Sequence, residues 1–259
     1  MTRRAEVPQP PLPSHPMATR AFGWYLDRLA RKTFASVRWR SETEWRGWDA
    51  AIPTLVVANH TSWWDGFLSH QVTRAMGHDF RILMQADNLA RYSFFRRIGA
   101  MPIERRSAPQ AMRDLESAGA ALVPGTMLWI YPQGARRPAG ESLSALEAGA
   151  AWLITRHPGP LRVLPVAFRY VLLSEQHPEA MISVGSPWLV HAKNDLRGPI
   201  TADICAHLTT TVAELDARLR VESLDGFLPL VSGTPSINNR LDRVRHALGL
   251  LPDFQARNG

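Results

Sequence analysis

An apolar run passes directly into polar residues in the stretch TLVVANHTSWWDG, which spans residues 54–66. Residues 54–58 predict a buried strand, because a short continuous apolar run is typical of the centre of a sheet. A helix is predicted to begin near Trp63. His60 would then lie in the turn at the carboxyl end of a strand, where α/β folds place their ligand sites.

The same alternation of strands and helices continues along the chain. Further strands are predicted at Arg81–Met84, Met101–Ile103, Thr126–Tyr131, Val163–Tyr170 and Met181–Val184. Further helices are predicted at Leu89–Arg97, Ala108–Leu122, Leu143–Arg156 and Ala202–Arg220. This order indicates an α/β fold with a central, mostly parallel or mixed sheet flanked by helices.

Two segments are expected before this domain. Residues 1–17 are rich in proline and predict a disordered leader. Residues 18–49 predict an amphipathic helical segment that contacts a membrane, with its helix running from Ala18 to Trp39. The alternative is an amphipathic helix that only packs against the domain, as in most globular proteins.

The folded domain is expected to occupy residues 50–225, followed by a C-terminal helical extension at residues 226–259. Apolar residues recur every three or four positions between Ile237 and Leu251, which predicts one helical stripe. Docking of this helix on the domain and a second membrane contact are both compatible with the stripe.

Composition limits the possible classes of protein. The chain has 259 residues, a formal net charge of +7 and a single cysteine, so a disulfide framework is excluded. No stretch has the roughly 20 predominantly apolar residues of a membrane span, and the N-terminus lacks the apolar core of a signal peptide. The basic balance favours an anionic partner, namely nucleic acid, anionic lipid or a phosphorylated substrate.

His60 and Asp65 form a candidate catalytic pair. A carboxylate can orient an imidazole through one ring nitrogen while the other nitrogen removes a proton from a substrate hydroxyl. No convincing nucleophile lies nearby, so the pair suits activation of the substrate's own hydroxyl. The alternative is structural, since Ser62 and Asp65 also fit a helix capping box.

Two other segments place arginines after strand-like pieces. The stretch YPQGARRP, residues 131–138, contains Gly134 and the pair Arg136 and Arg137. The stretch GAMPIERR, residues 99–106, ends in a second arginine pair. Arginines at the carboxyl end of a strand make an anion site, although arginine pairs are also common on solvated surfaces.

In chain order these segments resemble the glycerolipid acyltransferase family, which includes bacterial 1-acyl-glycerol-3-phosphate acyltransferases. The family's first block, Asn-His-x-Ser-x-x-Asp, is present at residues 59–65. Its second block, a glycine, a hydrophobic stretch and an acidic–Arg pair, is similar to residues 99–105. Its third, usually Phe-Pro-Glu-Gly-Thr-Arg-Ser, resembles residues 131–137, and its Val-Pro-Val-like fourth block resembles residues 164–167.

The resemblance implies an O-acyltransferase in which His60 removes the proton of the acceptor hydroxyl and Asp65 orients His60. The hydroxyl attacks the thioester of acyl-CoA or acyl-carrier protein, which is a co-substrate, and no cofactor or metal is expected to be bound. Arg105 and Arg136 would hold the phosphate of a lysophosphatidate-like lipid, and Gly134 would let the backbone approach closely. The expected substrate-binding set is Asn59, Ser62, Arg105, Gln133, Gly134, Arg136 and Arg137.

The third block departs from the family pattern at two positions. Gln133 stands where the family usually has Glu, and Ala135 where it has Thr. The neutral amide favours a changed acceptor, such as an aminolipid, a glycolipid or a glycosylated carotenoid, while Arg137 could maintain phosphate binding. We expect the enzyme to sit peripherally on the anionic surface at the cytoplasmic face of a membrane.

Three other functions fit parts of the sequence. A nucleic-acid-binding protein would explain the basic charge, but no binding motif is present, so nucleic acid is not expected as a partner. A metal-dependent hydrolase would add His70 or His78 to His60 and Asp65, at spacings that match no metal site we can defend. A catalytically silent lipid-binding relative is the third alternative.

Overall fold

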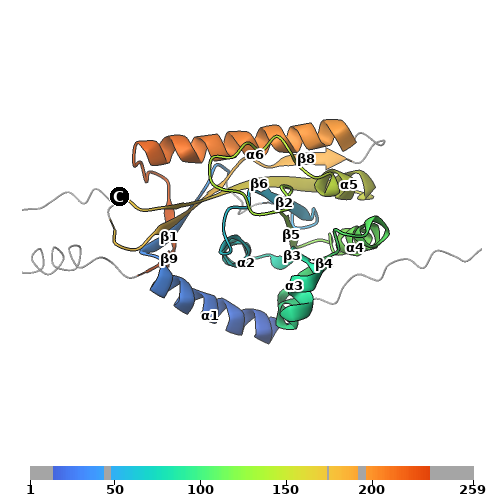
Figure 1. Ribbon diagram of the computed structural model, residues 1–259, viewed down its shortest axis with the longest axis horizontal. Helices are drawn as coiled ribbons and strands as arrows, with labels where there is room; N and C mark the ends of the chain where they lie inside the picture. Colours follow the sequence, from blue (N-terminus) through green and yellow to red (C-terminus); the bar gives the residue numbers. More distant parts are fainter. Residues whose placement is uncertain (1–13, 44–47, 174, 192–196, 234–259) are drawn as a thin grey trace, which may run out of the picture.

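A mixed, nine-stranded sheet lies at the centre of the computed structural model, which describes residues 14–43, 48–173, 175–191 and 197–233 (Figure 1). The strands are β1 (Ser36–Ser41), β2 (Thr54–Ala58), β3 (Asp79–Gln85), β4 (Ala100–Ile103), β5 (Thr126–Ile130), β6 (Pro160–Val171), β7 (Glu179–Val184), β8 (Trp188–His191) and β9 (Leu228–Ser232). Their order is β4-β3-β5-β2-β6-β7-β1-β9, with β8 paired to β6. The α/β prediction with a mixed sheet is confirmed.

The first five strands in this order run parallel to one another, from β4 through β3, β5 and β2 to β6. β7 is antiparallel to β6, and β1 is parallel to β7. Strand β2 is buried along its whole length, because helices cover both faces of the sheet. Its side chains alternate between two cores: Leu55 and Val57 face one, and Val56 and Ala58 face the other.

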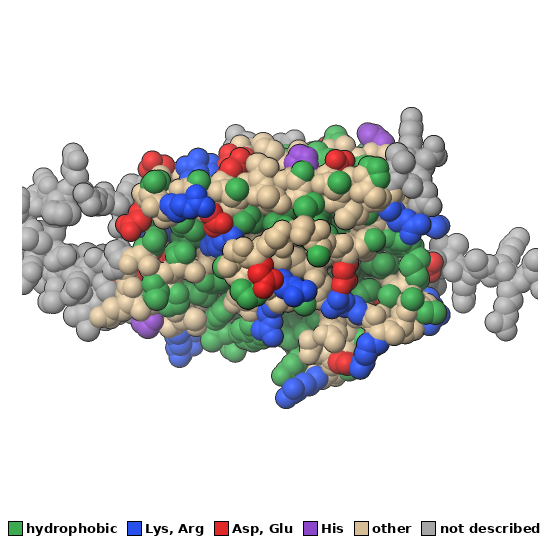
Figure 2. Space-filling model, turned by 45° about the horizontal axis from the view of Figure 1, so that its top comes forward, with side chains coloured by type: hydrophobic (Ala, Val, Ile, Leu, Met, Phe, Trp, Pro, Cys, Tyr) green, Lys and Arg blue, Asp and Glu red, His purple; other side chains and the backbone are tan. Residues whose placement is uncertain are grey.

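Helices form a layer on each side of this sheet (Figure 1). The helices are α1 (Pro16–Thr33), α2 (Asp65–Ala75), α3 (Ala86–Arg91), the 3-10 helix η1 (Ser93–Ile98), α4 (Ala108–Ala120), α5 (Gly149–Arg156) and α6 (Arg197–Arg220). α1 and α2 contribute apolar residues to one core, and α4, α5 and α6 contribute to the other. Figure 2 shows that acidic and basic side chains are interspersed over the face that carries α6.

The predicted N-terminal helix is too long at its carboxyl end. Residues 36–41, SVRWRS, form β1, which pairs with β7 and β9. Val37 and Trp39 are buried while Arg38 and Arg40 between and after them are half-buried, so this segment alternates with the period of a strand. At its other end α1 begins at Pro16, a position where proline's missing N–H costs no hydrogen bond.

Other element boundaries also differ from the expectations. Strand β9 lies in the segment predicted to be a C-terminal helical extension, and it pairs with β1 because Val231 packs into the core. The predicted stripe at residues 237–251 lies outside the described residues. α5 begins at Gly149 rather than Leu143, and the short edge strand β8 was not predicted. Among the described residues, no helix is both long enough and apolar enough to cross a membrane.

Candidate active site

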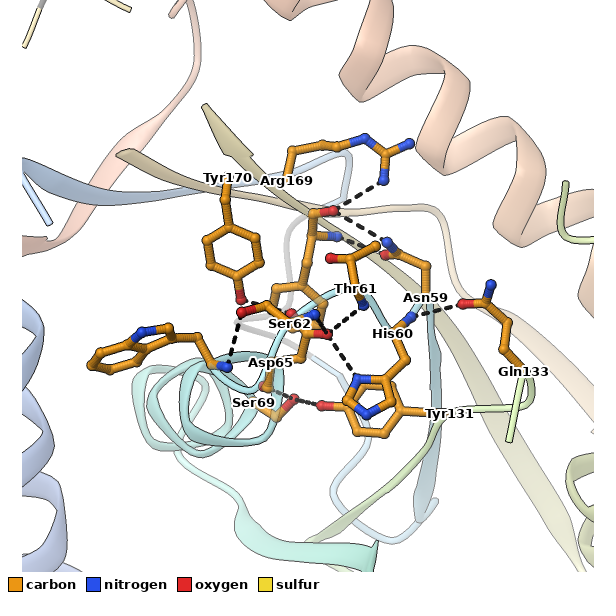
Figure 3. Close-up of polar contacts among 12 residues, drawn as sticks. Asn59, His60, Thr61, Ser62, Asp65, Ser69, Tyr131, Gln133, Arg169 and Tyr170 are labelled. Atoms are coloured by element: carbon orange, nitrogen blue, oxygen red, sulfur yellow. Dashed lines mark hydrogen bonds and ion pairs between the residues drawn. The ribbon is translucent and has the colours of Figure 1, made fainter. Parts of the chain in front are cut away.

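The site lies where parallel strands end at one edge of the sheet. β2 and β5 are neighbours, with Val57 paired to Ile130, so the residues that follow them leave the sheet side by side. The imidazole of His60 stacks on the ring of Tyr131, with ring centroids 4.3 Å apart and an interplanar angle of 19° (Figure 3). The topology therefore brings the first and third sequence blocks together.

His60 and Asp65 are in direct contact. The Nδ1 atom of His60 lies 2.8 Å from Oδ2 of Asp65, whose side chain is 0 % exposed. Because the carboxylate accepts hydrogen bonds, Nδ1 carries the proton in this pair and Nε2 is the ring nitrogen left to act as a base. No partner of Nε2 is present among the described residues, and the His60 side chain is 23 % exposed.

Asp65 also caps the turn that precedes α2. The backbone N–H groups of Thr61 and Ser62 donate to its Oδ2 atom at 2.7 and 2.8 Å. Ser62 Oγ accepts from the backbone N–H of Trp64 at 3.1 Å, and α2 begins at Asp65, two residues later than predicted. The capping interpretation and the catalytic-pair interpretation therefore describe the same carboxylate, which holds the turn and the imidazole together.

Two partly buried tyrosines complete the surroundings of the pair (Figure 3). The hydroxyl of Tyr170, on β6, donates to Asp65 Oδ1 at 2.6 Å. Ser69 donates to the backbone oxygen of Asp65, so Tyr131 is the donor in its 2.8 Å contact with Ser69 Oγ. Burial, followed by the negative charge of Asp65, raises the pKa of both tyrosines well above the usual value. Both phenols therefore remain protonated donors at physiological pH.

Sequence reasoning gave Tyr170 and Ser69 no role, and it quoted Tyr131 without assigning one. Tyr170 is 105 residues from Asp65 in the chain, and only the pairing of β6 with β2 brings the two together. The aromatic residue at the head of the third block was the one available signal, since it directly follows a strand that neighbours β2.

Two of the predicted substrate-binding side chains point into the protein interior and contact the backbone. Asn59 is buried, and its amide donates to the backbone oxygen of Phe168 and accepts from the Phe168 N–H, at 3.2 and 2.7 Å. Gln133 is also buried, and its Oε1 accepts from the backbone N–H of His60 at 2.8 Å. The N–H of Arg137 donates to the backbone oxygen of His60 at 2.8 Å. These contacts fix the backbone on both sides of the imidazole.

The predicted anion-binding residues lie on two loops that meet at Gly134. Arg105, after β4, donates from Nη1 to the backbone oxygen of Gly134 and forms an ion pair with Glu147 through Nη2. Gly134 has φ +68°, a left-handed conformation that favours glycine. Arg136 and Arg137 are exposed, and neither side chain has a polar partner among the described residues. No contact joins the Arg136 side chain to His60.

The histidines considered as metal ligands lie apart from His60 and Asp65. Within the described ranges, no group of three or more His, Cys, Asp or Glu side chains could hold a metal ion. The ring of His70 lies between Phe22 and Phe80, with centroid distances of 5.3 and 5.1 Å, and His78 Nδ1 lies 3.0 Å from the backbone oxygen of Met76. Neither histidine faces His60, so the residues offered for a metal-dependent hydrolase are not brought together.

Comparisons with known proteins agree with this arrangement. Residues 43–169 match the family model described as Acyltransferase. The fold is similar to that of the 1-acyl-sn-glycerophosphate (LPA) acyltransferase PlsC from Thermotoga maritima, with a TM-score of 0.55, 16 % sequence identity, and coverage of 77 % of this chain and 80 % of that one. No curated protein sequence matches the chain. Residues 43–169 are therefore similar to the acyltransferase family, and the fold of the chain is similar to that of PlsC.

Proposed function

We propose that the protein is a membrane-associated O-acyltransferase that transfers a fatty acyl group from an acyl thioester to the hydroxyl of a lysophosphatidate-like lipid. The observation that carries this proposal is the buried carboxylate of Asp65 on Nδ1 of His60, at the carboxyl edge of the sheet. The Acyltransferase family match supports acyl transfer as the chemistry. In this proposal His60 is the general base and Asp65 its positioning residue.

The reaction needs no covalent enzyme intermediate. Nε2 of His60 takes the proton of the acceptor hydroxyl as its oxygen attacks the carbonyl carbon of the thioester. Asp65 stabilises the imidazolium that forms, as the carboxylate does in a serine-protease triad. When the tetrahedral intermediate collapses, the carbon–sulfur bond breaks. The thiolate that leaves takes the proton from His60, which returns the imidazole to its neutral form. The products are an ester and a free thiol, of coenzyme A or of acyl-carrier protein.

An anionic acceptor is supported by the arginines beside this edge. Arg136 and Arg137 are exposed and lie on the loop whose backbone contacts His60, and Arg105 reaches the same loop at Gly134. Guanidinium groups bind phosphate through two parallel hydrogen bonds. The contact of Gln133 with the His60 N–H supports a role in the catalytic turn, so a neutral amide at this position is compatible with a phosphate acceptor.

A different acceptor remains the second candidate, and Gln133 is the observation that favours it. The amide has one negative charge fewer than the glutamate usual in the family. An acceptor with an amino or sugar headgroup, such as an aminolipid, a glycolipid or a glycosylated carotenoid, would undergo the same transfer at His60. The two candidates differ only in the headgroup that the arginine loop would contact.

Exposed aromatic side chains support docking on a membrane surface. They belong to α1, to the turn before α2 and to the region around η1: Trp24, Tyr25, Trp63, Tyr92 and Phe94. Ring contacts through Phe22 and Phe67 join these segments into one surface beside the His60 turn. Basic residues such as Arg20, Arg28 and Arg91 are exposed on the same elements. Amphipathic aromatic and basic residues are typical of peripheral contact with anionic lipid.

The face in Figure 2 does not carry the charge pattern expected of a nucleic-acid-binding protein. Nucleic-acid-binding proteins present a continuous basic stripe or patch. On the face shown, carboxylates interrupt the basic residues, so the described residues of that face offer no such stripe.

The direct test is thiol release from palmitoyl-CoA by purified protein, with lysophosphatidate, other lysolipids and 1-acylglycerol as acceptors and products identified by mass spectrometry. Release that requires an acceptor and is lost in His60→Ala supports the proposal. Release with an amino- or sugar-bearing acceptor alone selects the second candidate. Normal transfer by His60→Ala, or no transfer from either palmitoyl-CoA or palmitoyl-acyl-carrier protein, refutes the mechanism.

Membrane association is tested by sedimentation with phosphatidylglycerol vesicles and with phosphatidylcholine vesicles. The double variant Trp24→Ser and Tyr25→Ser should bind the anionic vesicles more weakly than the wild type, because it removes two exposed aromatic anchors. The matched control is Leu172→Ser, which removes an exposed apolar residue between β6 and β7. Equal binding by both variants and the wild type would exclude α1 as the contact.

A further inference from the structure

Arg105 already holds a carboxylate of its own chain. Its guanidinium forms an ion pair with Oε1 of Glu147, which lies two residues before α5, and donates to the backbone oxygen of Gly134. Glu147 thus binds the guanidinium of Arg105, which was expected to bind the acceptor's phosphate. No motif of the sequence drew attention to Glu147.

The backbone holds Glu147 in this position. The N–H of Glu147 donates to the backbone oxygen of Pro132 at 2.7 Å, which ties the start of α5 to the third sequence block. A Cβ atom on Gly134 would collide with the Glu147 carboxylate and with Nη2 of Arg105. Because glycine has no Cβ atom, the Arg105–Glu147 ion pair can lie directly against the backbone at this position. The pair is part of the loop structure.

The neighbouring arginines are in two different states. Arg106 is paired with Glu104 and with Asp87, so its charge is also compensated. In the part of the chain that the structure describes, the side chains of Arg136 and Arg137 have no carboxylate partner. Of the three arginines expected to bind the acceptor, Arg105, Arg136 and Arg137, only Arg105 forms an ion pair with a carboxylate among the described residues.

We propose that Glu147 is a specificity-determining residue that competes with the acceptor's phosphate for Arg105. This inference rests on the proposed phosphate acceptor. The side chains of Arg105 and Glu147 are 42 % and 49 % exposed, and ion pairs this exposed are weak enough to be displaced. A phosphate monoester carries more charge and more acceptor oxygens than one carboxylate, so it can replace Glu147. A headgroup without phosphate cannot, and the Arg105–Glu147 pair stays closed beside it.

The test measures phosphate binding without turnover. Inorganic phosphate is titrated into the full-length protein while the backbone amide of Gly134 and the side-chain Nε–H of Arg105 are followed by NMR. Glu147→Gln should lower the dissociation constant for phosphate by about two- to fivefold, the range that an exposed ion pair can supply. The additional substitution Arg105→Gln should abolish that gain, because the freed guanidinium is the binding group.

Asp87→Asn provides the matched control. It removes one negative charge and opens an ion pair on the adjacent Arg106, so general electrostatics alone would tighten phosphate binding equally in both variants. Equal tightening, an unchanged or weaker affinity in Glu147→Gln, or the absence of phosphate binding in both the wild type and Glu147→Gln would overturn the proposal.

A kinetic measurement separates this inference from the proposed function. Glu147→Gln should lower the KM for lysophosphatidate and leave the KM for 1-acylglycerol unchanged. If the enzyme transfers an acyl group to none of the acceptors, the proposed function is refuted. The phosphate titration would still show whether Glu147 competes with phosphate for Arg105. Equal changes in both KM values would overturn the inference while transfer itself remained established.

Discussion

The hydroxyl of Tyr170 donates to Oδ1 of Asp65 at 2.6 Å, while Oδ2 of the same carboxylate faces Nδ1 of His60 at 2.8 Å. Both oxygens are thereby fixed, one by strand β6 and the other by the turn that carries the imidazole. A carboxylate held on both sides cannot rotate away from His60. The orientation of His60 thus depends on Tyr170, which lies outside the four sequence blocks.

Tyr170→Phe removes this hydroxyl and keeps the ring. We expect kcat to fall by about tenfold, equivalent to about 1.4 kcal/mol of activation free energy, because Asp65 gains freedom to rotate. The free energy of unfolding should fall by about 1 kcal/mol with the loss of one partly buried hydrogen bond. Steady-state kinetics and urea unfolding measure both. Tyr25→Phe, at an exposed position, is the control. An unchanged kcat in Tyr170→Phe would show that Asp65 is held sufficiently by the turn alone.

Gln133 contacts the backbone of the catalytic turn, so its substitution should affect kcat more than KM. Gln133→Ala leaves the His60 N–H without its acceptor and should lower kcat by about tenfold, with the acceptor's KM within about twofold of wild type. Gln133→Glu retains an acceptor oxygen and should keep most of the activity. If Gln133→Ala instead has normal kcat and a changed preference among lysolipids, the side chain acts on the acceptor.

Arg136 should act on the acceptor alone. Its guanidinium is exposed and makes no contact with the His60–Asp65 pair, so Arg136→Ala should raise the KM for lysophosphatidate by about tenfold through the loss of a charge-assisted contact. The kcat should stay near the wild-type value. Arg113→Ala, which removes an exposed arginine on α4, is the matched control. Equal KM values for Arg136→Ala and the wild type would remove Arg136 from the acceptor site.

The sequence predicted the local part of the site because that part is built over short distances in the chain. His60 and Asp65 are five residues apart on one strand–turn–helix unit, so their contact follows from the predicted elements. Tyr170 reaches Asp65 only through the register of β6 against β2, which depends on pairing between distant segments. The resemblance pointed to Gln133 as a substrate contact, yet its hydrogen bond to a backbone N–H has no signature in the sequence.

Most of the alternating strands and helices were predicted, and the error at residues 36–41 occurred where two periodicities overlap. Phe34 and Val37 are three residues apart and fit the apolar stripe of α1, but Val37 and Trp39 alternate with arginines as in a strand. Pairing of β1 with β7 and β9 decides the conformation, and that pairing involves residues about 140 and 190 positions away. Local propensity alone could not have selected the strand.

The last prediction concerns the acid sensitivity of the fold. Burial, followed by the charge of Arg74, lowers the pKa of His70 from 6.5 to about 4. The unfolded chain therefore binds this proton at a higher pH than the folded protein. The free energy of unfolding is therefore unaffected by this proton above pH 6.5. It falls by about 3 kcal/mol as the pH decreases from 6.5 towards 4. Urea unfolding between pH 7 and 4 should show a shallower loss of stability in His70→Leu than in the wild type. His191→Gln, at an exposed histidine, should follow the wild type, and parallel pH profiles for all three proteins would exclude His70 as the source.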